Sequence, residues 1–265
     1  MNLIRKKFDF VGTPVLAGLF AVLFLLETKF QLRRRVQNRW SRIKINSQLA
    51  VPSFALLRFM FLPSMVYLAN RNKLIRVLIG YFVPSHILRQ IGAFLLLDYT
   101  NYLWHILNHK IPLLWRFHLV HHTDKDLDLT TAFRFHFGEM IGSLFYRGFF
   151  TFLSGATPLT VIIYEIAFEA ATEFHHSNTR LPHNLEGELN KVIVTPRMHG
   201  IHHSVISKET NSNFSVIFSI WDRLHGTLNL KVDQDDIIIG IPEYADADEL
   251  NTSFLFKLPF TQVRR

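Results

Sequence analysis

The chain contains no cysteine, which excludes disulfide bonds, thiolate metal ligands and a cysteine nucleophile. It also lacks a GxGxxG dinucleotide-binding motif, an internal repeat and a low-complexity segment. Charged residues are scarce, at 19% of its 265 residues, whereas hydrophobic residues reach 49% and include 25 phenylalanines. This composition is not that of an ordinary soluble enzyme, and it favours a membrane protein.

The net charge of +8 does not indicate a nucleic-acid partner, because the positive residues are concentrated rather than spread. Seven lysines and arginines lie between Lys29 and Lys44, in a stretch that separates two apolar segments. Such a stretch is typical of a cytosolic loop beside a membrane, in contact with anionic lipid headgroups.

The apolar segments are long enough to predict a helical membrane bundle. The first, Phe10–Leu26, carries no charge and approaches the ~20 residues that a bilayer span needs. This segment is not read as a secretory signal, because it is too long and lacks an obvious small-residue cleavage site. The others are Ala50–Ala69 (interrupted by Arg58 and two prolines), a short interfacial run Val77–Val83, Ile87–Leu107, and Phe137–Glu173, which forms a hairpin of two crossings hinged at residues 154–158.

The distribution of positive charge predicts the orientation of this bundle. Seven positive residues in the basic stretch outweigh the competing Arg5-Lys6-Lys7, so the basic stretch is assigned to the cytosol. Following the spans from there brings every clustered histidine to the cytosolic side. The predicted fold is an all-α integral membrane protein, a bundle of about four to five spans with a cytosolic histidine-rich helical cap.

Histidine spacing is the most specific signal in the chain. Three clusters place imidazoles three or four residues apart, which puts them on one face of a helix. Eight or nine imidazoles are too many for one ion and suit a dinuclear metal site. The nine are His105 and His109; His118, His121 and His122; His199, His202 and His203; and the separate His176.

Carboxylates on the same apolar helices are the other candidate functional residues. Asp98 shares a helical face with His105 and His109, so we expect it to accept a hydrogen bond from a ligand imidazole rather than merely bond a neighbouring helix. Glu165, Glu169 and Glu173 form a stripe that leads to His176. Glu173 is the favoured functional member, as a partner of the ligands, a proton carrier or a ligand, and the alternative for the stripe is pairing with arginines.

The order HxxxH, HxxHH, H, HxxHH resembles the fatty acid hydroxylase/sterol desaturase superfamily of membrane oxygenases. The flanking sequences LLWRFH (113–118), FRFHFGE (133–139), FHHSN (174–178), TPRMH (195–199) and WDRLHGT (221–227) strengthen the likeness, which spans residues 98–227. The resemblance implies a non-haem di-iron centre whose ligands are the nine histidines. A tenth ligand has no clear match, and the candidates are His183, His175 and Asn178. We expect His136 and His225 to have structural roles.

By this resemblance, residues 1–86 hold the N-terminal spans and basic loop, residues 87–230 form the hydroxylase/desaturase domain, and residues 231–265 form a tail on the cap. The implied enzyme is an oxidoreductase that hydroxylates or desaturates a membrane lipid with O2, in a bacterial inner membrane or the endoplasmic reticulum. No flavin, haem or cytochrome b5-like segment is present, so electrons must come from an external cytochrome b5-like protein, ferredoxin or reductase. Arg33–Arg42 and Arg264-Arg265 are candidate docking sites. Residues 123–128 are expected to form a mobile gating loop or a plain solvated one.

Two alternatives follow from the histidines alone. A zinc-dependent membrane hydrolase would use a metal-bound water and a general base, with zinc in place of iron. A metal transporter or sensor would place its ligands near the middle of the membrane between repeats, whereas these clusters are predicted at one membrane edge.

Overall fold

The computed structural model describes residues 8–264, and these residues are helical with no strand longer than isolated antiparallel bridges. The prediction of an all-α fold is therefore confirmed for this part of the chain. Arg5-Lys6-Lys7 and Arg265, which entered the predictions of topology and docking, lie outside the described residues.

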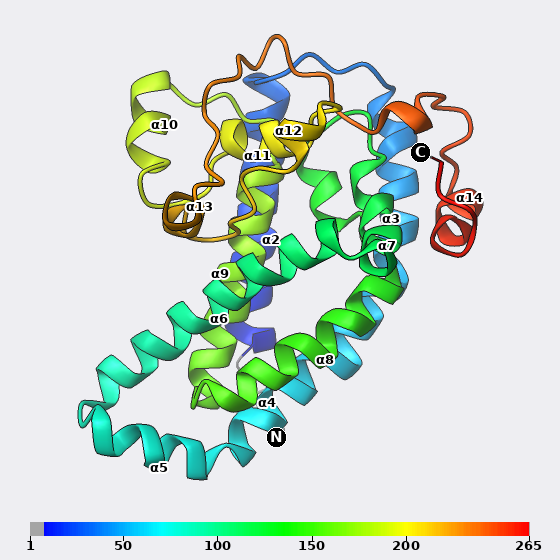
Figure 1. Cartoon of the computed structure of the whole chain (residues 1–265). Coiled ribbons are helices and arrows are strands. Elements are labelled where there is room, and N and C mark those ends of the chain that lie inside the picture. The colour runs from blue at the N-terminus through cyan, green and yellow to red at the C-terminus, as the bar shows by residue number, and fades with distance from the viewer. Residues whose placement is uncertain (1–7, 265) are drawn as a thin grey trace.

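The elements up to α9, which ends at His176, build a bundle, and the rest of the chain mainly builds a cap (Figure 1). The bundle elements are η1 (Phe8–Gly12), α2 (Thr13–Lys29), α3 (Arg39–Leu56), η2 (Leu57–Phe61), α4 (Leu62–Arg71), α5 (Lys73–Phe82), α6 (His86–Lys110), α7 (Pro112–His122), η3 (Leu129–Phe133), α8 (Phe137–Leu153) and α9 (Pro158–His176). The remaining elements are α10 (His183–Leu189), α11 (Pro196–His202), α12 (Ser207–Thr210), α13 (Ile220–His225), η4 (Pro242–Tyr244), α14 (Thr252–Lys257) and η5 (Leu258–Phe260).

Local sequence signals set several helix starts. Asn38 caps α3 by accepting from the backbone N–H groups of Trp40 and Ser41. Thr157 caps α9 and Thr195 caps α11, and in both helices a proline follows directly, where its missing N–H costs no helical hydrogen bond. The predicted hairpin is present: α8 and α9 are joined by residues 154–157, with Gly155 at a φ of 67° that a side chain would strain.

The prolines at 52 and 63 do not interrupt the second apolar segment as the sequence suggested. Arg39–Arg71 is one continuous helical stretch of 33 residues. Its middle, η2, is a π-helical turn directly before Pro63. Wider i→i+5 bonding at such a turn accommodates the carbonyl group that a proline leaves without its usual donor.

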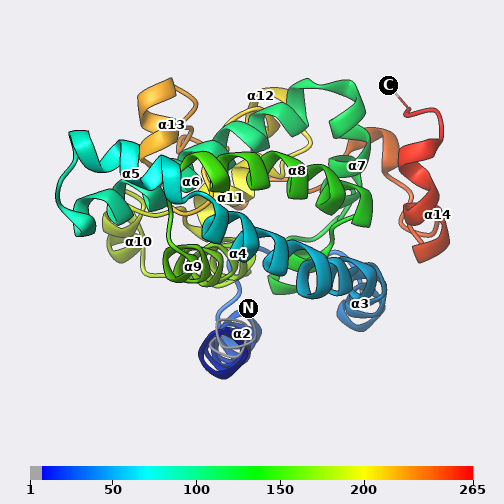
Figure 2. The same cartoon turned by 90° about the horizontal axis from the view of Figure 1, so that it is seen from below.

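The helices α4, α6, α8 and α9 pack against one another around a core that includes Phe61, Met65, Leu97 and Tyr164. Helix α2 packs on α9 from outside and lies at the edge of the bundle, as the view in Figure 2 shows. The short helices α10 to α13 gather at one end, where they meet α7 and the ends of α6 and α9 (Figure 1).

Two helical stretches in residues 8–264 are long and apolar enough to cross a membrane, Phe8–Lys29 and Arg39–Arg71. The apolar window of the first is only 11% buried, so it does not act as the core helix of a soluble fold. Large apolar side chains are also exposed on the other bundle helices, for example Phe82, Ile91, Phe145 and Phe149. Apolar surface on this scale fits contact with lipid.

Candidate metal centre

Four separate chain segments bring histidines to one place, where the bundle meets the cap. The last two turns of α6 carry His105 and His109, and α7 carries the next three. His176 is the final residue of α9, and the third cluster belongs to α11 and the residue after it. All nine sequence-predicted histidines thus meet, although 98 residues separate the first from the last.

Their ring nitrogens form two groups, and within each group the candidate ligand atoms lie within 4.8 Å of one another. Helix α7 divides its histidines, sending the i,i+4 pair His118 and His122 to one group and His121 to the other. In the cluster at 199–203, the i,i+4 pair His199 and His203 joins the group of His121, and His202 joins the group of His118 and His122. The five-histidine group is His105, His109, His118, His122 and His202, and the four-histidine group is His121, His176, His199 and His203.

Nitrogen separations test whether a metal fits each group. At a metal–nitrogen distance of about 2.1 Å, neighbouring ligand nitrogens stand about 3.0 Å apart at right angles and about 3.4 Å apart at the tetrahedral angle. In the four-histidine group, the Nε2 atoms of His121 and His176, His176 and His199, and His199 and His203 lie 3.1, 3.0 and 3.1 Å apart. In the five-histidine group, the Nε2 atoms of His118 and His122 lie 3.2 Å apart. Both groups fit an imidazole-bound ion.

In four of the rings, a hydrogen bond made by Nδ1 determines that Nε2 faces the centre. Three of the four acceptors are backbone carbonyl groups. Nδ1 of His105, His176 and His202 each donates to a backbone carbonyl oxygen at 2.8 Å, on Phe214, Thr172 and Ser212 respectively. A carbonyl only accepts, so Nδ1 carries the hydrogen and Nε2 presents its lone pair inward. The Nε2 atoms of His109 and His202 are buried and have no hydrogen-bond partner among the described residues. Lone pairs left in this way are what a metal ion would use.

Glu139 completes this pattern, although sequence analysis assigned it no role. Nδ1 of His118 lies 3.0 Å from its carboxylate, in the arrangement of a carboxylate that orients a ligand imidazole. Nδ2 of Asn108 points to the same carboxylate oxygen at 3.4 Å. The available signal was a lone carboxylate in the first turn of an otherwise apolar helix, α8.

Burial also keeps the cap histidines uncharged. It lowers the pKa of His202 to about 3 and, together with neighbouring imidazoles, lowers the pKa values of His199 and His203 well below the usual range. At neutral pH these rings are therefore in the unprotonated form that a metal requires.

The remaining histidines have other partners. His136 caps α8, accepting from the N–H of Gly138, and its Nε2 faces the carbonyl oxygen of Phe256. His225 stacks on Tyr99 and Tyr102, so both have the structural roles that the sequence predicted. Of the candidates for a tenth ligand, none belongs to the two groups. His183 is exposed. The side-chain amide of Asn178 accepts from the backbone N–H of Arg33 and donates to its carbonyl oxygen. His175 packs beside the four-histidine group, with its ring centroid 4.1 Å from that of His199.

The predicted role of Asp98 is wrong. Its carboxylate accepts from the backbone N–H groups of Ile217 and Phe218 and from the indole N–H of Trp221, and from no imidazole. Asp98 and His105 do share a helical face, but seven residues of rise separate them by about 10 Å along the axis. Asp98 instead ties the segment before α13 to α6.

All three glutamates of the stripe on α9 line an apolar cavity of about 550 Å³ between α2, η2 and α9. Glu165 also forms a buried ion pair with Arg147 at 2.7 Å. Glu173 is 4% exposed, and one of its carboxylate oxygens has no hydrogen-bond partner within residues 8–264.

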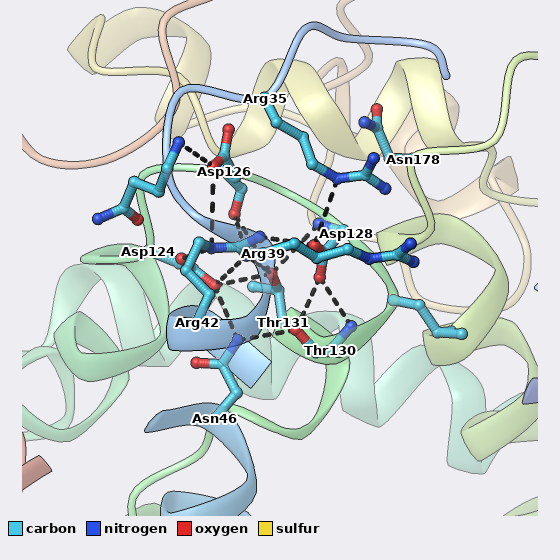
Figure 3. A network of polar contacts seen from close by, with 12 residues as sticks. Arg35, Arg39, Arg42, Asn46, Asp124, Asp126, Asp128, Thr130, Thr131 and Asn178 are labelled. Atoms are coloured by element: carbon cyan, nitrogen blue, oxygen red, sulfur yellow. Dashed lines mark hydrogen bonds and ion pairs between the residues drawn. The ribbon is translucent and has the colours of Figure 1, made fainter. Parts of the chain in front are cut away.

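A buried network fixes the loop that follows α7 (Figure 3). Arg42 of α3 donates to the carboxylates of Asp124 and Asp128 and to the backbone oxygen of Asp126. Burial opposes ionisation of Asp124, but the charges of Arg42 and Arg134 outweigh it and lower its pKa. Because Thr123, Asp124, Asp126 and Asp128 are all buried, the predictions of a mobile gating loop and of a solvated loop are both wrong.

Several arginines of the basic stretch make internal contacts in or beside this network. Arg33 and Arg42 are buried, and Arg39 pairs with the fully buried Glu27 at 2.7 Å. Glu27 also accepts from the backbone of Leu129 and Asn178. The prediction that Arg33–Arg42 offers a docking surface is therefore wrong for these side chains. For Arg42 the local sequence could not reveal this, because its partners Asp124 and Asp128 lie 82 and 86 residues away.

Fold and site together define a helical protein that exposes much apolar surface and has two buried histidine groups, each able to hold a metal ion. Comparison with known sequences adds the family: the profile described as "Fatty acid hydroxylase" matches residues 90–227, just over half of the chain. The chain therefore belongs to the fatty acid hydroxylase family, and the resemblance predicted from the histidine order is confirmed.

Individual relatives are similar over the same region. Alkylglycerol monooxygenase of Xenopus tropicalis is 33% identical over 135 residues, which cover 51% of this chain and 29% of that protein. Ornithine lipid hydroxylase OlsE of Rhizobium tropici is 32% identical over 145 residues, covering 54% and 43%. Human cholesterol 25-hydroxylase is 30% identical over 141 residues, covering 51% and 48%. The chain thus spans less than half the length of each of these relatives. No solved structure matches.

Proposed function

We propose that the protein is an O2-dependent lipid hydroxylase or desaturase, an oxidoreductase that acts at a pair of iron ions held by the nine histidines. The observation that carries the proposal is the convergence of the two imidazole groups in a chain of the fatty acid hydroxylase family. The named relatives are all lipid hydroxylases or monooxygenases, which favours this function over a zinc hydrolase or a transporter.

The residues of this chain have defined tasks in the proposal. An iron pair, when bound, would supply the reduction of O2 needed to attack an unactivated C–H bond. The imidazoles hold the ions, and the acceptors on Nδ1 fix the ring orientations. The Arg42 network holds the loop that follows α7 and so keeps the end of α7 in position.

An apolar route toward the centre supports a lipid substrate. The cavity of about 550 Å³ beside α2 shares Phe54, Leu57, Phe133 and Glu169 with a smaller hollow of about 100 Å³. The smaller hollow is lined by Phe135, whose ring stacks on that of His121 at 4.6 Å, and by Glu139. A lipid tail entering between α2 and α9 would reach the imidazoles by this path.

In this arrangement Glu173 is proposed to bind a polar group of the substrate or to carry a proton, while Asp98 holds the segment around α13 against α6. The named substrates of the relatives differ, so the proposed substrate class is a membrane lipid with an apolar chain. We further propose that four to five helices cross the membrane and that the centre faces the cytosol.

The test is the metal content and the oxygen dependence of the purified membrane protein. We expect two irons per chain and consumption of O2 with a lipid and a reductant. His121→Ala and His202→Ala remove one ligand from each group and should abolish turnover while the protein still inserts. His183→Ala, an exposed histidine outside both groups, is the matched control and should keep full activity. Unchanged turnover in both ligand variants would contradict the proposal.

Metal exchange separates iron from zinc. Zinc does not change oxidation state, so a zinc enzyme would work without O2 through a bound water. We expect chelation to remove activity, ferrous iron to restore it in air, and zinc to leave the protein inactive. A zinc-loaded protein that turns over under argon would show that it is a hydrolase instead.

A further inference from the structure

One histidine of the two groups is reachable from outside. Eight of the nine are buried, and only His109, at the end of α6, is partly exposed. It lines a surface hollow of about 890 Å³ formed by the end of α6, the start of α7 and residues 262–264. It also lines an adjoining hollow of about 290 Å³ that reaches α12 and η4.

Trp115 lies at the boundary between these hollows and the five-histidine group. It lines both hollows, and its ring centroid stands 5.0 Å from that of His109 and 5.4 Å from that of His122. Electron tunnelling weakens steeply with distance. An aromatic ring in contact with two imidazoles therefore shortens the route from the surface to the centre.

The rim of the larger hollow carries positive charge. Lys110 donates to the side-chain oxygen of Asn211, and Arg116 donates to the carbonyl oxygens of Pro259 and Thr261. These acceptors are neutral, so both cations keep their charge, whereas Arg264 is paired with Glu249 at 2.8 Å. Among residues 8–264, no carboxylate lines the larger hollow. A partner complementary to it would carry negative charge.

The proposed reaction requires such a partner. Hydroxylation consumes RH, O2, two electrons and two protons and yields ROH and H2O, and neither the lipid nor O2 supplies the electrons. We infer that the hollow around Lys110, Trp115 and Arg116 is the docking surface for an acidic one-electron carrier protein, which delivers these electrons one at a time past Trp115. This inference rests on the proposed function, and it moves the docking site away from the buried basic stretch.

Direct binding tests the surface without turnover. Full-length protein in nanodiscs of neutral lipid is immobilised, and an oxidised acidic [2Fe–2S] ferredoxin is passed over it at low salt. Lys110→Glu with Arg116→Glu should weaken binding at least about tenfold and remove most of its salt dependence, because rim charges steer association. Arg34→Glu with Lys44→Glu reverses two exposed cations elsewhere and should leave the affinity unchanged.

Turnover with two reductants supplies the second readout. With reduced ferredoxin, the Lys110/Arg116 variant should show a KM for the carrier raised about tenfold. With dithionite and methyl viologen it should match the unmodified protein. Ferredoxin binding that is absent, or that is unaffected by the charge reversal, overturns the docking surface. The docking surface is also overturned if ferredoxin binds only when the nanodisc contains anionic lipid, because the hollow would then be a surface for lipid headgroups. Failure of the unmodified protein to turn over with the small reductant overturns the proposed function instead.

Discussion

Each imidazole at the centre has two nitrogens, and the partner of one decides what the other can do. The carbonyl oxygens of Phe214, Thr172 and Ser212 select the tautomer of three rings without adding charge. His118 differs, because its partner Glu139 is a carboxylate. A carboxylate on Nδ1 makes Nε2 of the same ring a better electron donor to a metal. The pair of His118 and Glu139 is therefore the best place to test how a hydrogen-bond partner affects metal binding.

Replacing Glu139 should weaken metal binding without unfolding the protein. Glu139→Ala leaves the Nδ1–H of His118 without its acceptor, and loss of such a partner typically lowers metal affinity about 10- to 100-fold. Glu139→Gln keeps an acceptor but loses the charge, so its loss should be smaller. Competition with a chromogenic chelator measures both. Glu188→Gln, an exposed position on α10, is the control, and equal affinities in Glu139→Ala and the control would contradict the proposed role.

At the level of single residues, spacing along helices predicted the nine converging histidines because each cluster is a local pattern. The same reasoning failed for Asp98, since sharing a face does not bring residues seven positions apart into hydrogen-bond range. It could not find Glu139, because that side chain meets His118 from a different helix. Contacts between elements are set by packing, which no periodicity in one segment records.

Among the elements, the loop after α7 shows how a long-range ion pair shapes the site. Asp124 and Asp128 stand within six residues of His122, and Arg42 reaches both of them from α3. This fixes the end of the helix that gives three imidazoles to the two groups. The apolar segments were predictable from hydropathy alone, as was the hairpin of α8 and α9. The buried loop was not, because its Asp-rich sequence is the same as that of a solvated turn.

Removing the guanidinium should therefore destabilise the fold. Arg42→Met leaves buried carboxylates without their main partner, a change that costs about 3–5 kcal/mol, whereas Lys44→Met on the exposed face of α3 should change stability by less than about 0.5 kcal/mol. Thermal unfolding in detergent compares the two. If Arg42→Met does not fold, Arg42→Lys keeps the charge without the planar fork and should fall between them. Melting temperatures that match the Lys44→Met control in both Arg42 variants would show that the network is not needed.

For the whole molecule, the question is which side of the membrane holds the cap. The bundle half exposes large apolar side chains, while the histidine groups lie where the bundle meets the cap. Between the basic stretch and α6 the proposed topology crosses the membrane once, so the start of α5 and the cap should face opposite sides. The absence of cysteine makes this measurable, because any introduced thiol is the only one.

Single cysteines at Lys73, the first residue of α5, and at Glu188 on α10 are exposed positions that report the two sides. In intact bacterial cells, a membrane-impermeant maleimide should label Lys73→Cys and spare Glu188→Cys, and lysis should make both reactive. The unmodified chain controls for background. Because α6 would carry His105 and His109 to the side of the cap, labelling in the reverse order would place the centre outside the cytosol. Labelling of both positions in intact cells would show that no membrane separates them, and the four- to five-span topology would be wrong.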